Sequence, residues 1–243
     1  MVSPRAGSFA ALLIGALVLA ACASPAVSPQ LSTDGSTAER RCVPPDGVSG
    51  SPQTIDEVVA LIDALPPPVT LPCFLESLDR PLHVEAAISR SSAQPAYWDR
   101  SPRLFLFIGD LVLTVVPEGS GAALLELGEF VDETHTRKAE LVMPVATPVD
   151  PRAPYERVRY DDGTTCGGCH PSEARDDAID FADAFVSQAL RPREDDLVAL
   201  DRLRAEWLAC RPEDEPDRCA MLEALCAHGP LVHQAFPDSL PTL

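Results

Sequence analysis

Two thiols and an imidazole lie close together in the segment Cys166-Gly167-Gly168-Cys169-His170. Side chains of these types can form a redox disulfide, bind zinc, close a structural disulfide in a loop, or hold a larger cofactor. A redox pair of the thioredoxin type needs a strand-to-helix junction in a βαβ unit, and no such pattern surrounds this segment. Zinc is also disfavoured, because adjacent Cys169 and His170 suit tetrahedral geometry poorly and a structural site usually draws on a second paired cluster.

The segment resembles the haem-attachment motif of c-type cytochromes, in which a histidine directly follows the second of two closely spaced cysteines. Thiols at this spacing reach the two vinyl groups of one haem, and the imidazole beside the second thiol lies under the iron. The resemblance implies one covalent haem c, held by thioethers from Cys166 and Cys169 and by a proximal bond from His170 to the iron.

The motif does not determine the second axial ligand of the iron. Small helical c-type cytochromes supply a methionine from a proline-rich loop after the motif, and no Met-Pro loop follows His170 in this chain. The candidates are Met221, His228 and His233, and an iron without a second protein ligand is the remaining alternative. We favour Met221 because it lies on the apolar side of a predicted helix, although a methionine at helical spacing commonly fills a core.

The first 21 residues have the layout of a bacterial export signal. Arg5 precedes an apolar stretch at 9–20, which is too short to span a bilayer as a mature helix. The stretch ends in Leu19-Ala20-Ala21-Cys22, which resembles the lipobox of bacterial lipoproteins. The resemblance implies a lipid anchor on Cys22 and, because no aspartate directly follows it, a place in the outer membrane. An ordinary secretory signal is the alternative.

Residues 22–41 are rich in Ser, Thr, Pro and Ala and predict a flexible tether between the lipid and the folded part. In the whole chain, acidic residues outnumber basic ones 37 to 19, for a formal net charge of −18. This balance excludes a nucleic-acid binder, because phosphate contacts need clustered Lys and Arg. An electrostatic partner should be basic, for example a redox partner protein, although the charge also serves to keep an exported protein soluble.

Export places the chain in an oxidising compartment, where cysteines form disulfides. Cys42 and Cys73 flank the first predicted helix and are candidates for one bond. Cys210 and Cys219 flank the loop of a predicted helical hairpin and are candidates for a second. Cys226 lies further along the same predicted helix, and it is either a buried free thiol or the true partner of Cys210.

Hydrophobic periodicity predicts a β-rich domain at 42–154 and a helical haem-binding domain at 155–243. In the first, Thr54-Ile55-Asp56-Glu57 has the form of a capping box at the start of a helix that ends before Pro66. Short apolar runs bounded by turn residues then predict an antiparallel β-sandwich or half-barrel. Its strands are expected at 83–89, 104–108, 111–116, 122–127 and 139–145.

The predicted fold class is therefore α+β, with a small all-α, cytochrome c-like domain at the C-terminal end. Amphipathic stripes predict three helices there, at 172–190, 197–210 and 217–227. Because three short helices cannot bury their apolar faces alone, we expect them to pack on one another, on the β domain or around a haem.

These observations lead to two hypotheses about function. The first is a membrane-anchored protein with one covalent haem for periplasmic electron transfer or redox sensing. We expect such a protein to carry electrons instead of catalysing a reaction. The second is a haem-free binding or structural lipoprotein of the cell envelope, in which the two motif cysteines form a disulfide.

Overall fold

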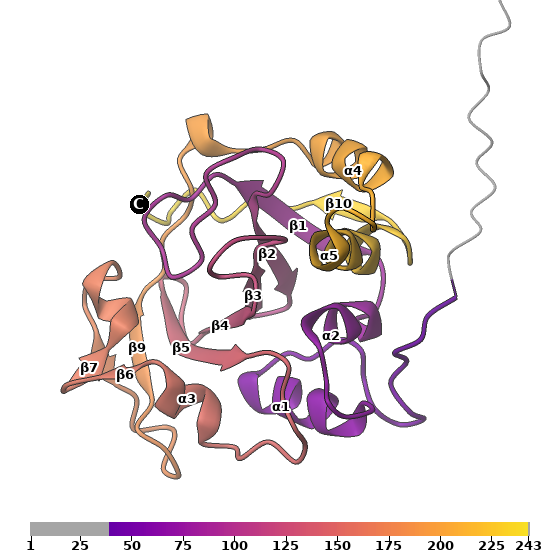
Figure 1. The fold of residues 1–243 in the computed structure, drawn as a ribbon. Coiled ribbons are helices and arrows are strands. Elements are labelled where there is room, and N and C mark those ends of the chain that lie inside the picture. The colour runs from indigo at the N-terminus through magenta and orange to yellow at the C-terminus, as the bar shows by residue number, and fades with distance from the viewer. Residues whose placement is uncertain (1–38, 243) are drawn as a thin grey trace, which may run out of the picture. The chain divides into compact units, whose positions relative to one another are not determined.

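The structure is a computed structural model, and it describes residues 39–242 (Figure 1). The predicted signal peptide, the anchor residue Cys22 and the tether up to residue 38 lie outside the described residues, as does residue 243. No helix within residues 39–242 is long and apolar enough to cross a membrane.

Threonine hydroxyls cap the first two helices. For α1 (Ile55–Ala64), the Thr54 side chain accepts a hydrogen bond from the Glu57 backbone N–H at 3.2 Å, as the capping-box pattern predicts. Thr70 accepts the equivalent bond at the start of α2 (Leu71–Ser77). Each helix therefore begins where a side chain replaces a missing backbone partner.

Eight strands form one mixed sheet in the order β10-β1-β2-β3-β4-β5-β9-β8. Neighbouring strands are antiparallel, except that β10 pairs parallel with β1. Gly109 and Asp110 form the predicted two-residue turn between β2 and β3, and Gly109 has a φ of 59°, which favours glycine. The strands are Leu82–Ala87 (β1), Arg103–Ile108 (β2), Leu111–Val115 (β3), Leu124–Phe130 (β4), His135–Val142 (β5), Ala174–Arg175 (β8), Phe185–Gln188 (β9) and Leu231–His233 (β10).

The two faces of this sheet are covered by different parts of the chain. Alternate residues of a strand point to opposite faces. Leu104, Leu106 and Leu113 belong to the main core, which also contains residues of α1, α2 and α5. On the opposite face, Phe107 and Val112 form a smaller apolar cluster with residues near the C-terminus. The run Leu104–Ile108, whose sequence does not alternate, is accordingly covered on both faces, as predicted.

Two disulfides connect the helices to their surroundings. Cys42 bonds to Cys73 in α2, and Cys210 bonds to Cys219 in α5 (Pro216–Cys226), with Cα–Cα distances of 5.3 Å and 5.6 Å. The first bond joins the predicted pair, and Cys219 is the partner of Cys210 among the two that the sequence left open. The second bond closes the hairpin between α5 and α4 (Leu200–Ala209). In Figure 1, α2 and α5 lie side by side, and the two helices contact each other.

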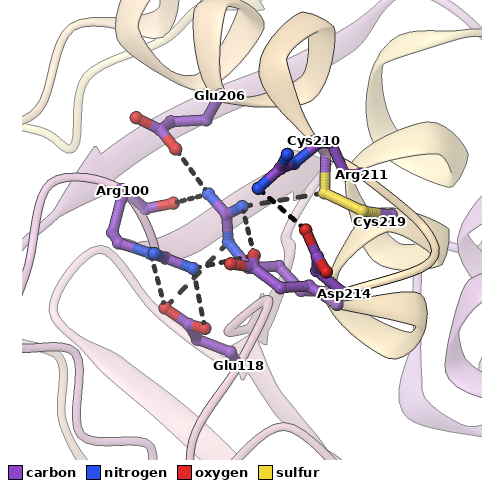
Figure 2. Close-up of a disulfide and its surroundings, with 9 residues drawn as sticks. Arg100, Glu118, Glu206, Cys210, Arg211, Asp214 and Cys219 are labelled. Carbon is purple, nitrogen blue, oxygen red and sulfur yellow. Dashed lines mark hydrogen bonds and ion pairs between the residues drawn. A yellow bond between two sulfur atoms is a disulfide. The ribbon is translucent and has the colours of Figure 1, made fainter.

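A buried arginine fixes the α4–α5 hairpin to the loop before β2. Arg218 donates to the Arg100 carbonyl oxygen at 2.6 Å and forms ion pairs with Glu206 and Glu215 at 2.7 Å and 2.9 Å. Figure 2 shows Arg100, Glu118 and Glu206 around the second disulfide. Because these contacts join segments far apart in the sequence, they hold the hairpin on the sheet.

The prediction of a small all-α, cytochrome c-like domain is wrong. Residues 172–190 form β8, turns and β9 instead of a helix, and α4 and α5 contribute to the same core as the sheet. Ser172, the first residue of the helix predicted at 172–190, has a φ of 60°. The backbone of β9 pairs with β5, so tertiary pairing of an otherwise open strand edge outweighs the helical spacing of the apolar residues. Within residues 39–242 the only other sheet is the two-stranded β6–β7 ribbon, and helices instead of a second large sheet cover the core face, so a sandwich is not formed.

Short elements connect β5 to β8 and carry the motif. They are α3 (Ala153–Arg157), a ribbon of β6 (Arg159–Tyr160) and β7 (Gly163–Thr164), and the 3₁₀ turn η1 (Thr165–Gly168). A second 3₁₀ turn, η2 (Glu194–Asp196), precedes α4. Figure 1 shows the β6–β7 ribbon near β9, at the opposite end of the sheet from α5.

Candidate functional site

All three chemically active residues of the motif line one pocket on the face of the sheet that faces away from α1 and α2. The pocket is a partly open hollow of about 160 Å³, and Cys166, Cys169 and His170 form one of its walls. The floor comes from outward-facing residues of β2 to β5. Its apolar part includes Phe105, Val112 and Phe130, next to Phe236 from the segment after β10, and its polar part includes Arg103, Thr114, Glu126, Thr136, Lys138 and Glu140.

The 3₁₀ turn η1 gives the motif its shape. Thr164, the last residue of β7, accepts hydrogen bonds on Oγ1 from the backbone N–H groups of Cys166 and Gly167, at 3.1 Å and 3.3 Å. The Cys166 carbonyl oxygen then accepts from the N–H groups of Cys169 and His170, at 3.0 Å and 2.9 Å. Backbone bonds thus bring both cysteines and the histidine to the same wall.

A carboxylate supports this turn from below. Glu173 accepts hydrogen bonds from the Thr164 backbone N–H at 2.9 Å and from the Thr164 hydroxyl. A Cβ atom on Gly163 or Gly167 would lie 2.2 Å or 2.7 Å from the Glu173 carboxylate, whereas a Cβ on Gly168 would meet nothing within 4 Å. Gly167 therefore leaves the space that the Glu173 carboxylate occupies, whereas Gly168 borders open space.

The His170 ring is held in one tautomer. Its Nδ1 lies 2.9 Å from the Gln188 carbonyl oxygen, and a carbonyl only accepts, so Nδ1 carries the proton and Nε2 presents its lone pair. Burial, with the nearby positive charges of Lys138 and Arg103, lowers the pKa of His170 to about 4. At neutral pH the ring is therefore an uncharged imidazole, which is the form that binds a metal ion.

The motif cysteines are both free thiols, unlike the four cysteines in disulfides. Cys166 is partly buried, and burial raises the pKa of its thiol even though Lys138 opposes the change. Cys169 is exposed. Cys226 is a third free thiol, buried in α5, and burial raises its pKa to about 11. Cys226 is thus the buried thiol of the two predicted alternatives, and it does not replace Cys219 as the partner of Cys210.

None of the three candidates for a second axial ligand lines the pocket. Met221 is buried in the main core, on the helical side of the sheet. His228 is buried with its Nε2 atom 3.9 Å from Glu76 in α2. His233 is exposed on β10, with its Nε2 atom 3.8 Å from Glu85. The preference for Met221 is not supported, because the sheet separates its side chain from the motif.

The expectation of a metal-binding helical cytochrome needs correction. Within residues 39–242, no group of three or more His, Cys, Asp and Glu side chains is arranged to hold a metal ion. The motif lies on a β-sheet rather than among helices. The wall of the pocket offers one neutral imidazole and two thiols, which do not form a cage for a bare ion.

Sequence reasoning found the motif but missed the residues that position it. Thr164, Glu173 and Gln188 act through side-chain or backbone atoms that no local pattern identifies. Lys138 is the only lysine in the chain, and this could have drawn attention to it. Its place in the pocket, however, depends on which side chains of β5 point to that face of the sheet. No protein-family model matches the chain, and no curated protein or solved structure shows significant similarity to it.

Proposed function

We propose that this chain is a lipid-anchored protein of the bacterial cell envelope that carries one covalent haem in the pocket and serves electron transfer or redox sensing. One observation carries the proposal. The two thiols and the imidazole of the motif line the same pocket, and the imidazole presents Nε2 while Nδ1 donates to a backbone carbonyl. This is the hydrogen-bond pattern expected for a histidine that binds a metal through its other nitrogen.

The donor set of the motif, two free thiols and one imidazole with a free Nε2, matches the groups that hold a covalent haem. Cys166 and Cys169 would hold the haem through two thioether bonds, and His170 would bind its iron. A haem supplies one-electron chemistry when bound. The aromatic floor, including Phe105, Phe130 and Phe236, would exclude water from one side of the ring. Gln188 keeps the His170 ring oriented and in the required tautomer.

The anchor and the partner are further parts of the proposal. The lipobox residues support lipidation of Cys22 and a location in the outer membrane, and the acidic composition supports docking to a basic redox protein. Replacing Cys22 with Ala should release the protein from the membrane fraction. If the variant stays membrane-bound in high salt, the lipid anchor is not what holds it there.

The haem-free alternative has weaker support. It requires that Cys166 and Cys169 form a structural disulfide, yet both thiols are free while two other cysteine pairs are bonded. Those two disulfides suit any exported protein and do not favour a particular function.

A single preparation tests the proposal. The full chain, exported by cells that contain the haem-attachment machinery, should be red and should show a c-type pyridine haemochrome spectrum. The double variant Cys166→Ser/Cys169→Ser should fold equally well but keep no haem after denaturation. A colourless, folded wild-type protein would overturn the haem proposal and favour the haem-free alternative.

A further inference from the structure

Lys138 is a buried ammonium group in the pocket without an ion-pair partner. It lies on β5, its side chain faces the pocket, and the residue is 8% exposed. Its Nζ donates to the Thr136 hydroxyl at 2.6 Å, and no carboxylate within residues 39–242 lies at ion-pair distance. An ammonium group buried in this way is costly to the folded chain unless a partner supplies negative charge.

The carboxylates in and around this pocket already have other partners. Glu126 forms an ion pair with Arg103, which also lines the pocket. Glu140 forms an ion pair with Arg157 at 3.0 Å. Glu173 uses both oxygens for the Thr164 hydrogen bonds described above.

The state of Lys138 agrees with this arrangement. Burial, together with the positive charge of Arg103, lowers its pKa to about 8 against the raising effects of Cys166, Glu126 and Glu173. The neighbouring Nε atom of Arg103 is buried and has no hydrogen-bond partner among the described residues. Two cationic side chains therefore lie close together in the pocket, and one of them has no counter-charge.

An apolar surface lies beside these cations in the pocket. Phe105 and Phe236 are in edge-to-face contact, with ring centroids 5.1 Å apart, and Val112 and Phe130 extend the same surface. A ligand that matches both parts combines a large apolar body with an acid group.

We propose that Lys138 is the carboxylate-binding group of this pocket, and that the ligand is an apolar molecule carrying at least one carboxylate. This carboxylate can come from two ligands. If the proposed function holds, it is a propionate of the haem; otherwise it belongs to a free apolar acid. A charge-assisted hydrogen bond from the ammonium to that carboxylate would supply the counter-charge that the chain itself does not provide.

Ligands with and without the acid group test this directly. The experiment uses the full chain with Cys166→Ser and Cys169→Ser, which cannot attach haem. Binding of haemin is compared with that of its dimethyl ester by absorbance titration. Binding of decanoate is compared with that of decanol by calorimetry. The same titrations are made after adding Lys138→Met, Lys138→Arg or the control Arg193→Met, which removes one exposed positive charge elsewhere. Circular dichroism and urea unfolding check that each variant folds, and Lys138→Gln replaces Lys138→Met if the latter does not.

We expect haemin to bind at least tenfold more tightly than its dimethyl ester. Lys138→Met should abolish this preference, whereas Lys138→Arg and Arg193→Met should retain it. If instead only decanoate depends on Lys138, the carboxylate site stands with a free acid as its ligand. If Lys138→Met changes neither preference, the inference is wrong. Attachment of haem to the wild-type chain is judged separately by the haemochrome spectrum, so either proposal can fail without the other.

Discussion

The two faces of the sheet differ in how their cysteines and charged groups are paired. On the helical face, both disulfides join residues that pack against the main core, and buried Arg218 links the α4–α5 hairpin to the strands. On the pocket face, the chain contributes a 3₁₀ turn and short strands, and it leaves two thiols, an imidazole and an ammonium group without covalent or ionic partners. The first face is stabilised by its disulfides, and the second leaves its two cysteines as free thiols.

The spacing of the cysteines explains part of this difference. The bonded pairs are separated by 31 and 9 residues, so each bond restricts a substantial loop of the unfolded chain. A bond between Cys166 and Cys169 would close a much shorter loop and restrict the unfolded chain least. Cysteines on the helical face therefore suit a structural role, whereas the pair beside His170 suits a ligand.

Removing the Cys42–Cys73 bond should have the largest effect on stability and none on haem attachment. On the loop-entropy estimate, Cys42→Ser/Cys73→Ser lowers the free energy of unfolding by about 3.7 kcal/mol, and Cys210→Ser/Cys219→Ser by about 2.7 kcal/mol. Urea unfolding measures the loss, and a haem stain after denaturing electrophoresis measures attachment. A folded variant that loses its haem would show that the two faces are coupled.

Met221 distinguishes a core residue from a ligand of the iron. Because it is 3% exposed in the main core, Met221→Ala should lower the free energy of unfolding by about 3 kcal/mol, whereas Met221→Leu should cost less than about 1.5 kcal/mol. Neither variant should change the visible spectrum of the haem-loaded protein. Some haem proteins with His/Met ligation show a near-infrared band. If the wild type shows this band and Met221→Leu loses it, Met221 binds the iron and does not lie in the core.

Local sequence patterns predicted those elements whose signals are local. Thr54 and Glu57 identify the start of α1, and the Gly109-Asp110 turn identifies the β2–β3 hairpin, because each depends on residues a few positions apart. The Cys42–Cys73 pair could be proposed because its cysteines flank a predicted helix, whereas the sequence left Cys219 and Cys226 as alternative partners of Cys210. The motif residues could likewise be identified without the fold.

The remaining features depend on contacts between distant segments. β9 forms because β5 offers an open edge, and the apolar spacing of 172–190 does not reveal that edge. His170 receives its hydrogen-bond partner, Gln188, from the same strand. The separation of Met221 from the motif follows from the sheet that lies between them, which no helical stripe could indicate.

The buried charge of Lys138 should appear as a pH dependence that its removal abolishes. Its pKa is about 8 in the folded haem-free chain and 10.5 as the ordinary value, so between these pH values the unfolded state binds more protons. The free energy of unfolding should therefore rise with pH across this window in the wild type relative to Lys138→Met, by on the order of 2 kcal/mol. Urea unfolding of both proteins at pH 7.5 and pH 10 measures the difference, in which other titrating groups cancel. If the free energy of unfolding changes equally with pH in the wild type and in Lys138→Met, Lys138 has an ordinary pKa and is better solvated than its burial indicates.

The two glycines of the motif provide the finest comparison, because they are adjacent and differ in what surrounds them. Gly167→Ala would push the Glu173 carboxylate away from Thr164, and the lost hydrogen bonds should lower the free energy of unfolding by about 1–2 kcal/mol. Gly168→Ala meets no atom within 4 Å and should change stability by less than about 0.5 kcal/mol.

If Glu173 positions the turn, Gly167→Ala should also increase the fraction of haem held by one thioether instead of two, as measured by mass spectrometry of the haem peptide. Glu173→Ala removes the group with which the new methyl collides, so the double variant Gly167→Ala/Glu173→Ala should be no worse than Glu173→Ala alone. Additive losses in the double variant would mean that the two residues act independently. A loss of stability without any change in the thioether fraction would mean that Glu173 supports the fold but does not set the direction of the thiols.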